Sequence, residues 1–294
     1  MIIVAANPYR GAPRPRARVE ALVGALEATG ATVQVVWDAA ERAALLADPG
    51  VMADVRCVVA AGGDGTVAAV INELPAAVPL AVLPTGTENL FARALGFDVA
   101  PARLARAIGI GTRQRLDLGR AHTSTGTRRF GLMLSAGFDA EVIHRIARLR
   151  TGDSTAKRVT RAHYVRPVGS AFWTYPHPPV SITADGTTTT ACYCLIGNLP
   201  DYALALSVTP EARADDGMLD WIAFERGGRL ALARYAWSVV SRTHVRLSHV
   251  RRGRARRLTV TSEAPVPVQL DGEPAGFTPV EVEVLPAALM VVVV

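Results

Sequence analysis

Hydrophobic and polar positions follow two alternating periods in the first third of the chain. Short continuous apolar runs, which are typical of buried strands, alternate with segments whose apolar residues recur at helical spacing. The predicted strands are residues 2–6, 32–37, 55–61 and 80–83, and the predicted helices are residues 17–29, 39–46 and 66–74. This alternation predicts an open α/β domain with a parallel sheet and helices on its faces.

Beyond residue 118 the pattern changes to short strand-like segments separated by Gly, Pro and Asp turns. The predicted strands are residues 129–135, 180–184, 191–197, 219–224, 245–250, 258–261, 266–270 and 280–284, with helices at 140–150 and 230–240. The apolar end, residues 289–294, reads as a buried last strand. We therefore predict two domains: an α/β domain over residues 1–119, completed by 285–294, and a β-rich domain over residues 120–284.

The composition is that of a globular protein. Half of the 294 residues are hydrophobic and a fifth are charged, which is enough apolar surface for a sizeable core. No apolar run approaches the roughly 18 residues that cross a bilayer, and the first strand continues into Asn7 without a basic leader. The three cysteines lack C-x-x-C spacing, and their odd number suits a reducing compartment. We expect a cytoplasmic protein.

The net charge of +6 reflects an excess of arginine, which is densest in residues 251–257. Such a run can contact an anionic membrane or a nucleic acid. It can equally be a solvated hairpin turn, and Gly253 between two alternating segments favours the turn. We predict the hairpin turn and no nucleic-acid partner.

Two glycine-containing loops carry the candidate chemistry. One follows a predicted strand, precedes a predicted helix and has the sequence Gly62-Gly63-Asp64-Gly65-Thr66. Glycines let a backbone approach a polyphosphate, and the helix N-terminus offers N–H groups to it. The spacing is neither that of a Walker loop nor that of a Rossmann loop. The second loop, residues 84–93, has Thr87 or Asn89 as candidate helix caps. Because both loops end strands of one sheet, we predict a phosphate site there.

These motifs resemble the diacylglycerol kinase catalytic-domain family, which includes bacterial lipid kinases and sphingosine kinases. The resemblance rests on the first glycine loop, on Pro84-x-Gly86-Thr87-x-Asn89 with Ala92-Arg93, and on Asn7-Pro8-x-x-Gly11. Further motifs of the same family follow in order at residues 115–119, 135–140, 216–220 and 270–274. The resemblance covers nearly the whole chain.

The resemblance implies a nucleotide-binding domain similar to those of NAD kinases and 6-phosphofructokinases, then a β-sandwich domain, with the active site between them. ATP and Mg²⁺ are the implied cofactors. The implied nucleotide-binding residues are Asn7, Gly62, Gly63, Asp64, Gly65, Thr66, Gly86, Thr87 and Asn89. Asp64 would act with magnesium at the transferred phosphate, and Asp271, with Glu273 nearby, would accept the proton of the attacking hydroxyl. A second, structural magnesium would be bound by Asp216 and by the carbonyls of Arg213 and Met218.

The implied activity is ATP-dependent phosphorylation of a hydroxyl on a lipid alcohol, such as diacylglycerol or a long-chain base. The expected partner is a lipid substrate at the inner face of the membrane, to which the protein would bind peripherally. Whether the protein forms a homodimer is left open. Two alternatives also stay open: a kinase of a soluble substrate such as NAD, and a degenerate nucleotide-binding regulator. The regulator is suggested by Ala68-Ala69, where the family usually has Asn-Glu, and by Leu90, where it usually has Asp.

Overall fold

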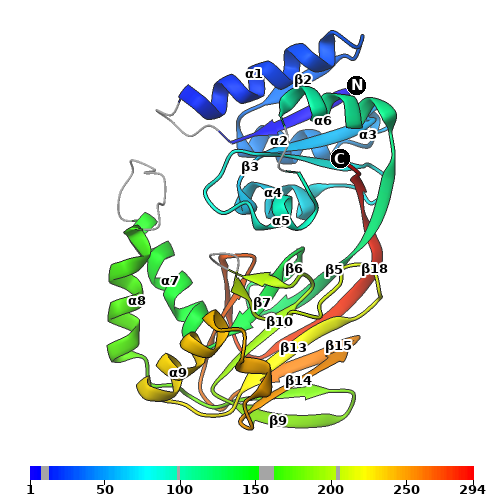
Figure 1. Cartoon of the computed structure of the whole chain (residues 1–294). Helices are drawn as coiled ribbons and strands as arrows, with labels where there is room; N and C mark the ends of the chain where they lie inside the picture. The colour runs from blue at the N-terminus through cyan, green and yellow to red at the C-terminus, as the bar shows by residue number, and fades with distance from the viewer. Residues whose placement is uncertain (8–12, 98–99, 152–161, 203–205) are drawn as a thin grey trace. The chain divides into compact units, whose positions relative to one another are not determined.

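The computed structural model describes residues 1–7, 13–97, 100–151, 162–202 and 206–294 (Figure 1). The chain divides into two compact units, one of Met1–Asp117 with Ala287–Val294 and one of Leu118–Pro286. The strands β5 (Arg113–Thr123) and β18 (Val280–Val292) each run from one unit into the other.

The first unit alternates strands and helices, as its hydrophobic pattern predicts. Its remaining strands are β1 (Ile2–Ala6), β2 (Val33–Val36), β3 (Cys57–Gly62) and β4 (Leu80–Pro84). Its helices are α1 (Pro13–Glu27), α2 (Ala39–Ala47), α3 (Pro49–Met52), α4 (Asp64–Glu73), α5 (Leu90–Ala94) and α6 (Pro101–Ile110).

The sheet of the first unit is parallel, in the order β2-β1-β3-β4, and the end of β18 lies beside β4 through the pair Val291 and Leu80. Every residue of β1, β3 and β4 is buried. Since successive strand residues point to opposite faces, both faces of the sheet are covered. The chain leaves β1 toward β2 on one side and returns to β3 on the other, so the topological switch point lies between β1 and β3.

The second unit is rich in antiparallel strands. They are β6 (Gly126–Phe130), β7 (Met133–Ala136), β8 (Val180–Ala184), β9 (Thr187–Ala191), β10 (Tyr193–Gly197), β11 (Asp201–Tyr202), β12 (Leu206–Ser207), β13 (Leu219–Phe224), β14 (Val250–Ala255), β15 (Arg257–Thr261), β16 (Pro267–Leu270) and β17 (Glu273–Phe277). Its helices are α7 (Phe138–Thr151), α8 (Ala162–Thr174), α9 (Arg229–Val240) and the short 3₁₀ helix η2 (His244–Arg246).

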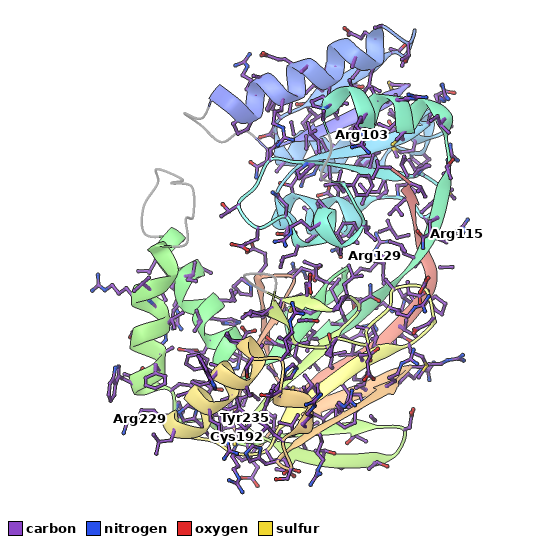
Figure 2. All side chains as sticks on the ribbon, in the orientation of Figure 1. Arg103, Arg115, Arg129, Cys192, Arg229 and Tyr235 are labelled. Atoms are coloured by element: carbon purple, nitrogen blue, oxygen red, sulfur yellow. The ribbon has the colours of Figure 1, made fainter. Side chains whose placement is uncertain are left out.

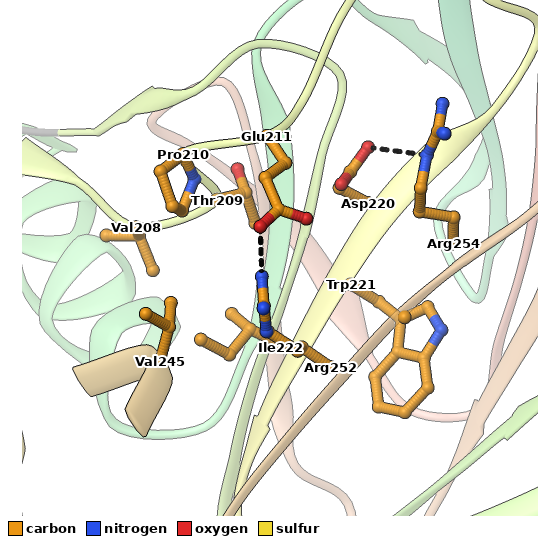
Figure 3. A pocket seen from close by; sticks show the side chains of 11 residues that line it. Val208, Thr209, Pro210, Glu211, Asp220, Trp221, Ile222, Val245, Arg252 and Arg254 are labelled. Carbon is orange, nitrogen blue, oxygen red and sulfur yellow. Dashed lines mark hydrogen bonds and ion pairs between the residues drawn. The ribbon is translucent and has the colours of Figure 1, made fainter. Parts of the chain in front are cut away.

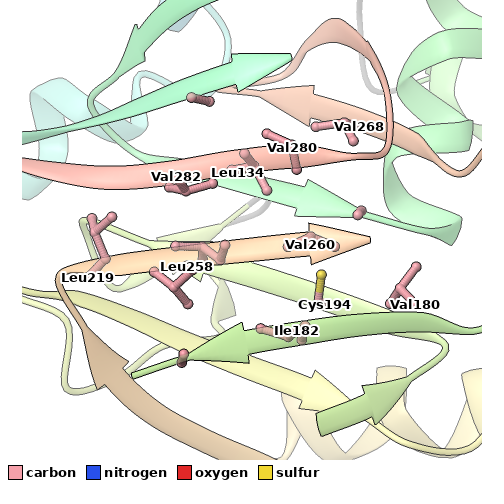
Figure 4. Packing of buried hydrophobic residues seen from close by; sticks show 14 of the residues in the cluster. Leu134, Val180, Ile182, Cys194, Leu219, Leu258, Val260, Val268, Val280 and Val282 are labelled. Atoms are coloured by element: carbon pink, nitrogen blue, oxygen red, sulfur yellow. The ribbon is translucent and has the colours of Figure 1, made fainter. Parts of the chain in front are cut away.

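Two sheets of the second unit face each other across one hydrophobic core. One has the order β14-β13-β10-β7-β16-β17, and the other contains β18, β15, β8 and β9. Leu134 and Val268 of the first sheet pack with Val260 and Val282 of the second (Figure 4). The predicted fold class, an NAD-kinase-like α/β domain followed by a β-sandwich, is confirmed. Cys194 lies in this core, where burial raises the pKa of its thiol to about 12.

Three local predictions for the second unit are wrong. Residues 129–135 form two strands, β6 and β7, because the chain breaks at Gly131 and Leu132 and changes sheet. Residues 245–250 form η2 and a turn instead of a strand. The arginine run is no hairpin turn: Gly253 lies inside β14 opposite Trp221, where a Cβ would come within 3.0 Å of the indole ring. Position 253 therefore requires glycine, because a side chain there would clash with the Trp221 ring. At Arg256 the chain passes from β14 in one sheet to β15 in the other.

Three helices, α3, α6 and α8, are absent from the sequence prediction. Among the helices of the described residues, none has the length and apolar character needed to span a bilayer.

Candidate functional site

Three segments of the first unit meet at the switch point: the end of β1, the β3–α4 loop and the β4–α5 loop. Asn7 follows β1, donates its backbone N–H to Ala61 (3.2 Å) and points its side-chain amide at the Thr66 hydroxyl (3.4 Å). Thr85, which begins the β4–α5 loop, donates its N–H to the Gly62 carbonyl (3.0 Å). Open α/β sheets bind ligands at this place, outside the carboxyl ends of the strands. Pro8 and Gly11 of the first motif lie outside the described residues.

The two glycine loops touch through their backbones. A Cβ on Gly86 would lie 2.5 Å from the Gly63 Cα, and one on Gly62 would lie 2.2 Å from the Thr66 hydroxyl. A side chain on Gly86 would push the two loops apart, and one on Gly62 would clash with Thr66 within the first loop. No side chain caps α4 at Gly63, so the helix directs its N-terminal N–H groups and positive dipole end into the loop. The arrangement suits the oxygens of a polyphosphate.

Asp64 joins the first loop to the helix after the second. Its carboxylate accepts the backbone N–H of Phe91 (3.0 Å), and burial raises its pKa above the ordinary aspartate value. Asp64 therefore supplies the cap for α5 that the sequence suggested for Thr87 or Asn89. The Asn89 side chain instead holds the loop, because it accepts the Gly86 N–H (2.9 Å) and donates to the Gly86 carbonyl (3.1 Å), at a left-handed φ of 51°. Thr87 is exposed.

Asp271 lies in the second unit, in the turn between β16 and β17, and its carboxylate is held by a row of backbone N–H groups. Oδ2 accepts from Gly131 (2.8 Å), and Oδ1 accepts from Leu132 (2.9 Å) and Met133 (2.8 Å). These donors come from the break between β6 and β7. The carboxylate is buried and fixed in one orientation by three charge-assisted hydrogen bonds. Glu273, the other acidic residue of this turn, begins β17 and is half-buried.

A buried polar network supports this turn. Gln269 accepts the Gly272 N–H (2.8 Å) and donates to the Ser135 hydroxyl (2.9 Å) and to Asp139 (3.3 Å). The hydroxyls of Ser135 and Tyr202 also donate to the Asp139 carboxylate. Burial raises the pKa of Asp139 although these three donors lower it. Asp139 belongs to the family motif at residues 135–140, which by itself assigns it no role, and no sequence pattern marks Gln269.

Asp216 belongs to a third acidic group, of which Asp220 lines a pocket of about 370 Å³ in the second unit (Figure 3). Arg254 forms ion pairs with Asp216 and with the buried Asp220, whose Oδ2 lies 3.6 Å from the arginine Nε. Across the pocket Glu211 pairs with Arg252 at 2.6 Å. Burial raises the pKa of Asp220, and the Arg254 charge opposes that rise.

These contacts do not suit the structural magnesium that the resemblance implies. Magnesium requires several oxygen ligands in octahedral geometry. Asp216 Oδ1 accepts the Met218 N–H (3.1 Å), and its other oxygen is paired with a guanidinium. In the described part of the chain no three His, Cys, Asp or Glu side chains form a group that could hold a metal. We therefore derive no step through a structural metal.

The fold is that of the NAD-kinase-like class, an α/β domain followed by a β-sandwich. Residues 1–121 match the family model of the diacylglycerol kinase catalytic domain, and residues 132–293 match that of the YegS C-terminal NAD kinase beta sandwich-like domain. The chain belongs to the diacylglycerol kinase catalytic-domain family and is a lipid kinase.

Known relatives are similar to this chain over most of their length. The diacylglycerol kinase of Mycobacterium tuberculosis strain H37Rv is 30% identical over 266 residues, 88% of this chain and 84% of that protein. A probable YegS-like lipid kinase of Pseudomonas putida is 28% identical over 92% of this chain and 88% of its own. The crystal structure of a putative diacylglycerol kinase from Bacillus anthracis has a TM-score of 0.76 at 21% identity and covers 100% of this chain and 96% of its own. An NAD kinase from Archaeoglobus fulgidus, solved with ATP, has a TM-score of 0.57 at 12% identity, covering 99% and 93%.

Proposed function

We propose that this protein transfers the γ-phosphoryl group of ATP to a hydroxyl of a lipid alcohol such as diacylglycerol, at the cytoplasmic face of the membrane. The observation that carries the nucleotide part is the backbone contact of the two glycine loops at the switch point. The names of the relatives at 28–30% identity support the lipid acceptor.

In this proposal the loops of the first unit hold the ATP phosphates. The N-terminus of α4, with the amides of the Gly63-Asp64-Gly65 turn, faces the negative charge. Asn7 and Thr66 add polar side chains, and Gly86 lets the second loop close on the first. Phosphoryl transfer needs alignment and charge neutralisation more than covalent assistance. Asp64, with the nucleotide phosphates, would hold the magnesium that accompanies ATP, and this ion would neutralise charge on the transferred group.

Asp271 is the proposed acceptor of the lipid hydroxyl proton. An alcohol is a poor nucleophile at neutral pH, and a positioned carboxylate contributes roughly 10²–10⁴-fold to such a step. The three N–H groups from residues 131–133 keep this carboxylate in one orientation. Gln269 and Asp139 position it through the turn, and neither is assigned a step of its own.

The test is an ATP-consumption assay of the purified chain against diacylglycerol, a long-chain base and NAD, with mass spectrometry of the product. We expect a phosphorylated lipid and no NADP. Asp64→Ala should reduce turnover by more than ~100-fold while the protein stays folded, because a charge aligned at metal and phosphate contributes several kcal/mol to transition-state binding. NADP as the only product, or nucleotide binding without turnover on any lipid, would overturn the proposal.

A further inference from the structure

The outward face of α9 is apolar where a surface helix is normally polar. Leu230 is 90% exposed, Trp237 72% and Val240 55%. They lie at positions i, i+7 and i+10, on one side of the helix, while Tyr235 and Val239 are buried on the other. A helix that needs only to cover the protein core has no use for a second apolar face.

Helix α8 extends this face. Trp173, one residue from the end of α8, is 69% exposed, and the guanidinium of Arg229 stacks over its ring at 4.9 Å from the centroid. Arg229 begins α9, and Figure 2 shows it beside the end of α8. The cation–π contact therefore joins the two helices into one surface of large apolar side chains. We call Trp173, Leu230, Trp237 and Val240 the apolar stripe.

The charge around the apolar stripe has one sign. Residues 226–250 contain five arginines and no aspartate or glutamate. The arginines are Arg226, Arg229, Arg234, Arg242 and Arg246. Within the described residues none of the five has an acidic partner at ion-pair distance, whereas Arg251, Arg252 and Arg254 of β14 each pair with a carboxylate. Four of the five arginines in the run 251–257 are thus ion-paired, whereas none of the five on α9 and its flanks is in the described part of the chain.

We propose that the apolar stripe and its arginines form the surface that docks on an anionic lipid bilayer. Tryptophan and leucine enter the headgroup and acyl boundary while arginines contact lipid phosphates, as in interfacial helices. A second copy of the chain is a poorer occupant, because two faces with five unpaired arginines each repel one another. The inference rests on the proposed function, since a lipid kinase must reach an acceptor that stays in a membrane.

The test measures binding of the full chain to sedimented vesicles in the absence of ATP, so that it is independent of turnover. Vesicles of phosphatidylcholine with phosphatidylglycerol should bind the protein, and vesicles of phosphatidylcholine alone should bind it much less. The variant Arg229→Gln/Arg234→Gln should bind the anionic vesicles about 30-fold more weakly, from roughly 1 kcal/mol for each charge near the surface. Its control is Arg251→Gln/Arg252→Gln, which loses the same net charge from ion-paired positions and should bind almost as wild type.

The variant Trp173→Ala/Trp237→Ala tests the apolar part, and both tryptophans are too exposed for their loss to unfold the protein. It should lose anionic-vesicle binding, yet keep its activity on a short-chain diacylglycerol dissolved in buffer. Equal losses in the two arginine variants, unchanged binding of the tryptophan variant, or a dimer that shields the stripe and does not bind vesicles would each overturn the inference. If the protein binds anionic vesicles but phosphorylates no lipid, the proposed function is refuted and the assignment of the docking surface is retained.

Discussion

Replacement of Asp271 by asparagine tests the anchoring of this side chain and its proposed chemistry in one variant. The backbone tolerates the change, because Asp271 has a φ of 49° and asparagine is the non-glycine residue that adopts this region most readily. The hydrogen bonds of the side chain do not tolerate the change. Three N–H groups point at the carboxylate, and asparagine offers one oxygen and one further donor.

The magnitude follows from the geometry. If the asparagine oxygen keeps the bonds from Leu132 and Met133, the buried Gly131 N–H faces an NH₂ group. One charge-assisted hydrogen bond is lost, a buried donor is left unsatisfied and the remaining bonds weaken, which together cost about 2–3 kcal/mol. For a unit of this size that lowers Tm by roughly 4–12 °C. Below this Tm, kcat should fall by about 10²–10⁴-fold with the ATP dissociation constant unchanged.

Calorimetric unfolding measures the change in Tm. Initial rates, measured well below the unfolding transitions of wild type and variant, measure the change in kcat. The chain provides a matched control in Asp185→Asn, since Asp185 has a φ of 48° but lies exposed in the β8–β9 turn. The control should change neither Tm nor kcat. An unaltered Tm for Asp271→Asn would refute the anchoring by residues 131–133, and a collapse of ATP affinity would refute the role as base.

Three further changes test other parts of the two units. Gly86→Ala puts a Cβ 2.5 Å from the Gly63 backbone, so ATP affinity measured by calorimetry should fall at least tenfold, about 1.4 kcal/mol; unaltered affinity would show that the loops need not touch. The raised pKa of Asp139 means that the folded state holds this proton more tightly, so its contribution to stability is lost as pH rises above 3.8. Urea unfolding between pH 4 and 8 should therefore show a smaller decline for Asp139→Asn than for wild type, and parallel curves would contradict the shift. Arg254→Gln leaves Asp216 without its cation and should lower Tm by roughly 2–4 °C, about 1 kcal/mol for this partly exposed pair; an unchanged Tm would show that the pair does not stabilise the unit.

The sequence by itself determined the fold class and the position of the glycine loops. Buried parallel strands require continuous apolar runs, and β1, β3 and β4 have them; a glycine loop between such a strand and a helix is also what a tight turn needs, and it was the pair of such loops on one sheet that indicated the phosphate site. Both signals are local, because each depends on residues within a few positions of one another. The order of the later motifs likewise identified the family before any contact was known.

Contacts between distant positions were decided only by the tertiary structure. Residues 129–135 look like one strand, and the break that presents three N–H groups to Asp271 exists because β6 and β7 belong to different sheets, some 140 residues before the carboxylate that they bind. Gly253 reads as a turn residue until Trp221 is placed against it. In the sequence the arginine run is the densest basic segment, yet four of its five arginines pair with acids up to 41 residues away, while the five arginines of α9 and its flanks have no acidic partner within the described residues. Packing and charge pairing are properties of neighbours in space, and a one-dimensional pattern records neighbours only along the chain.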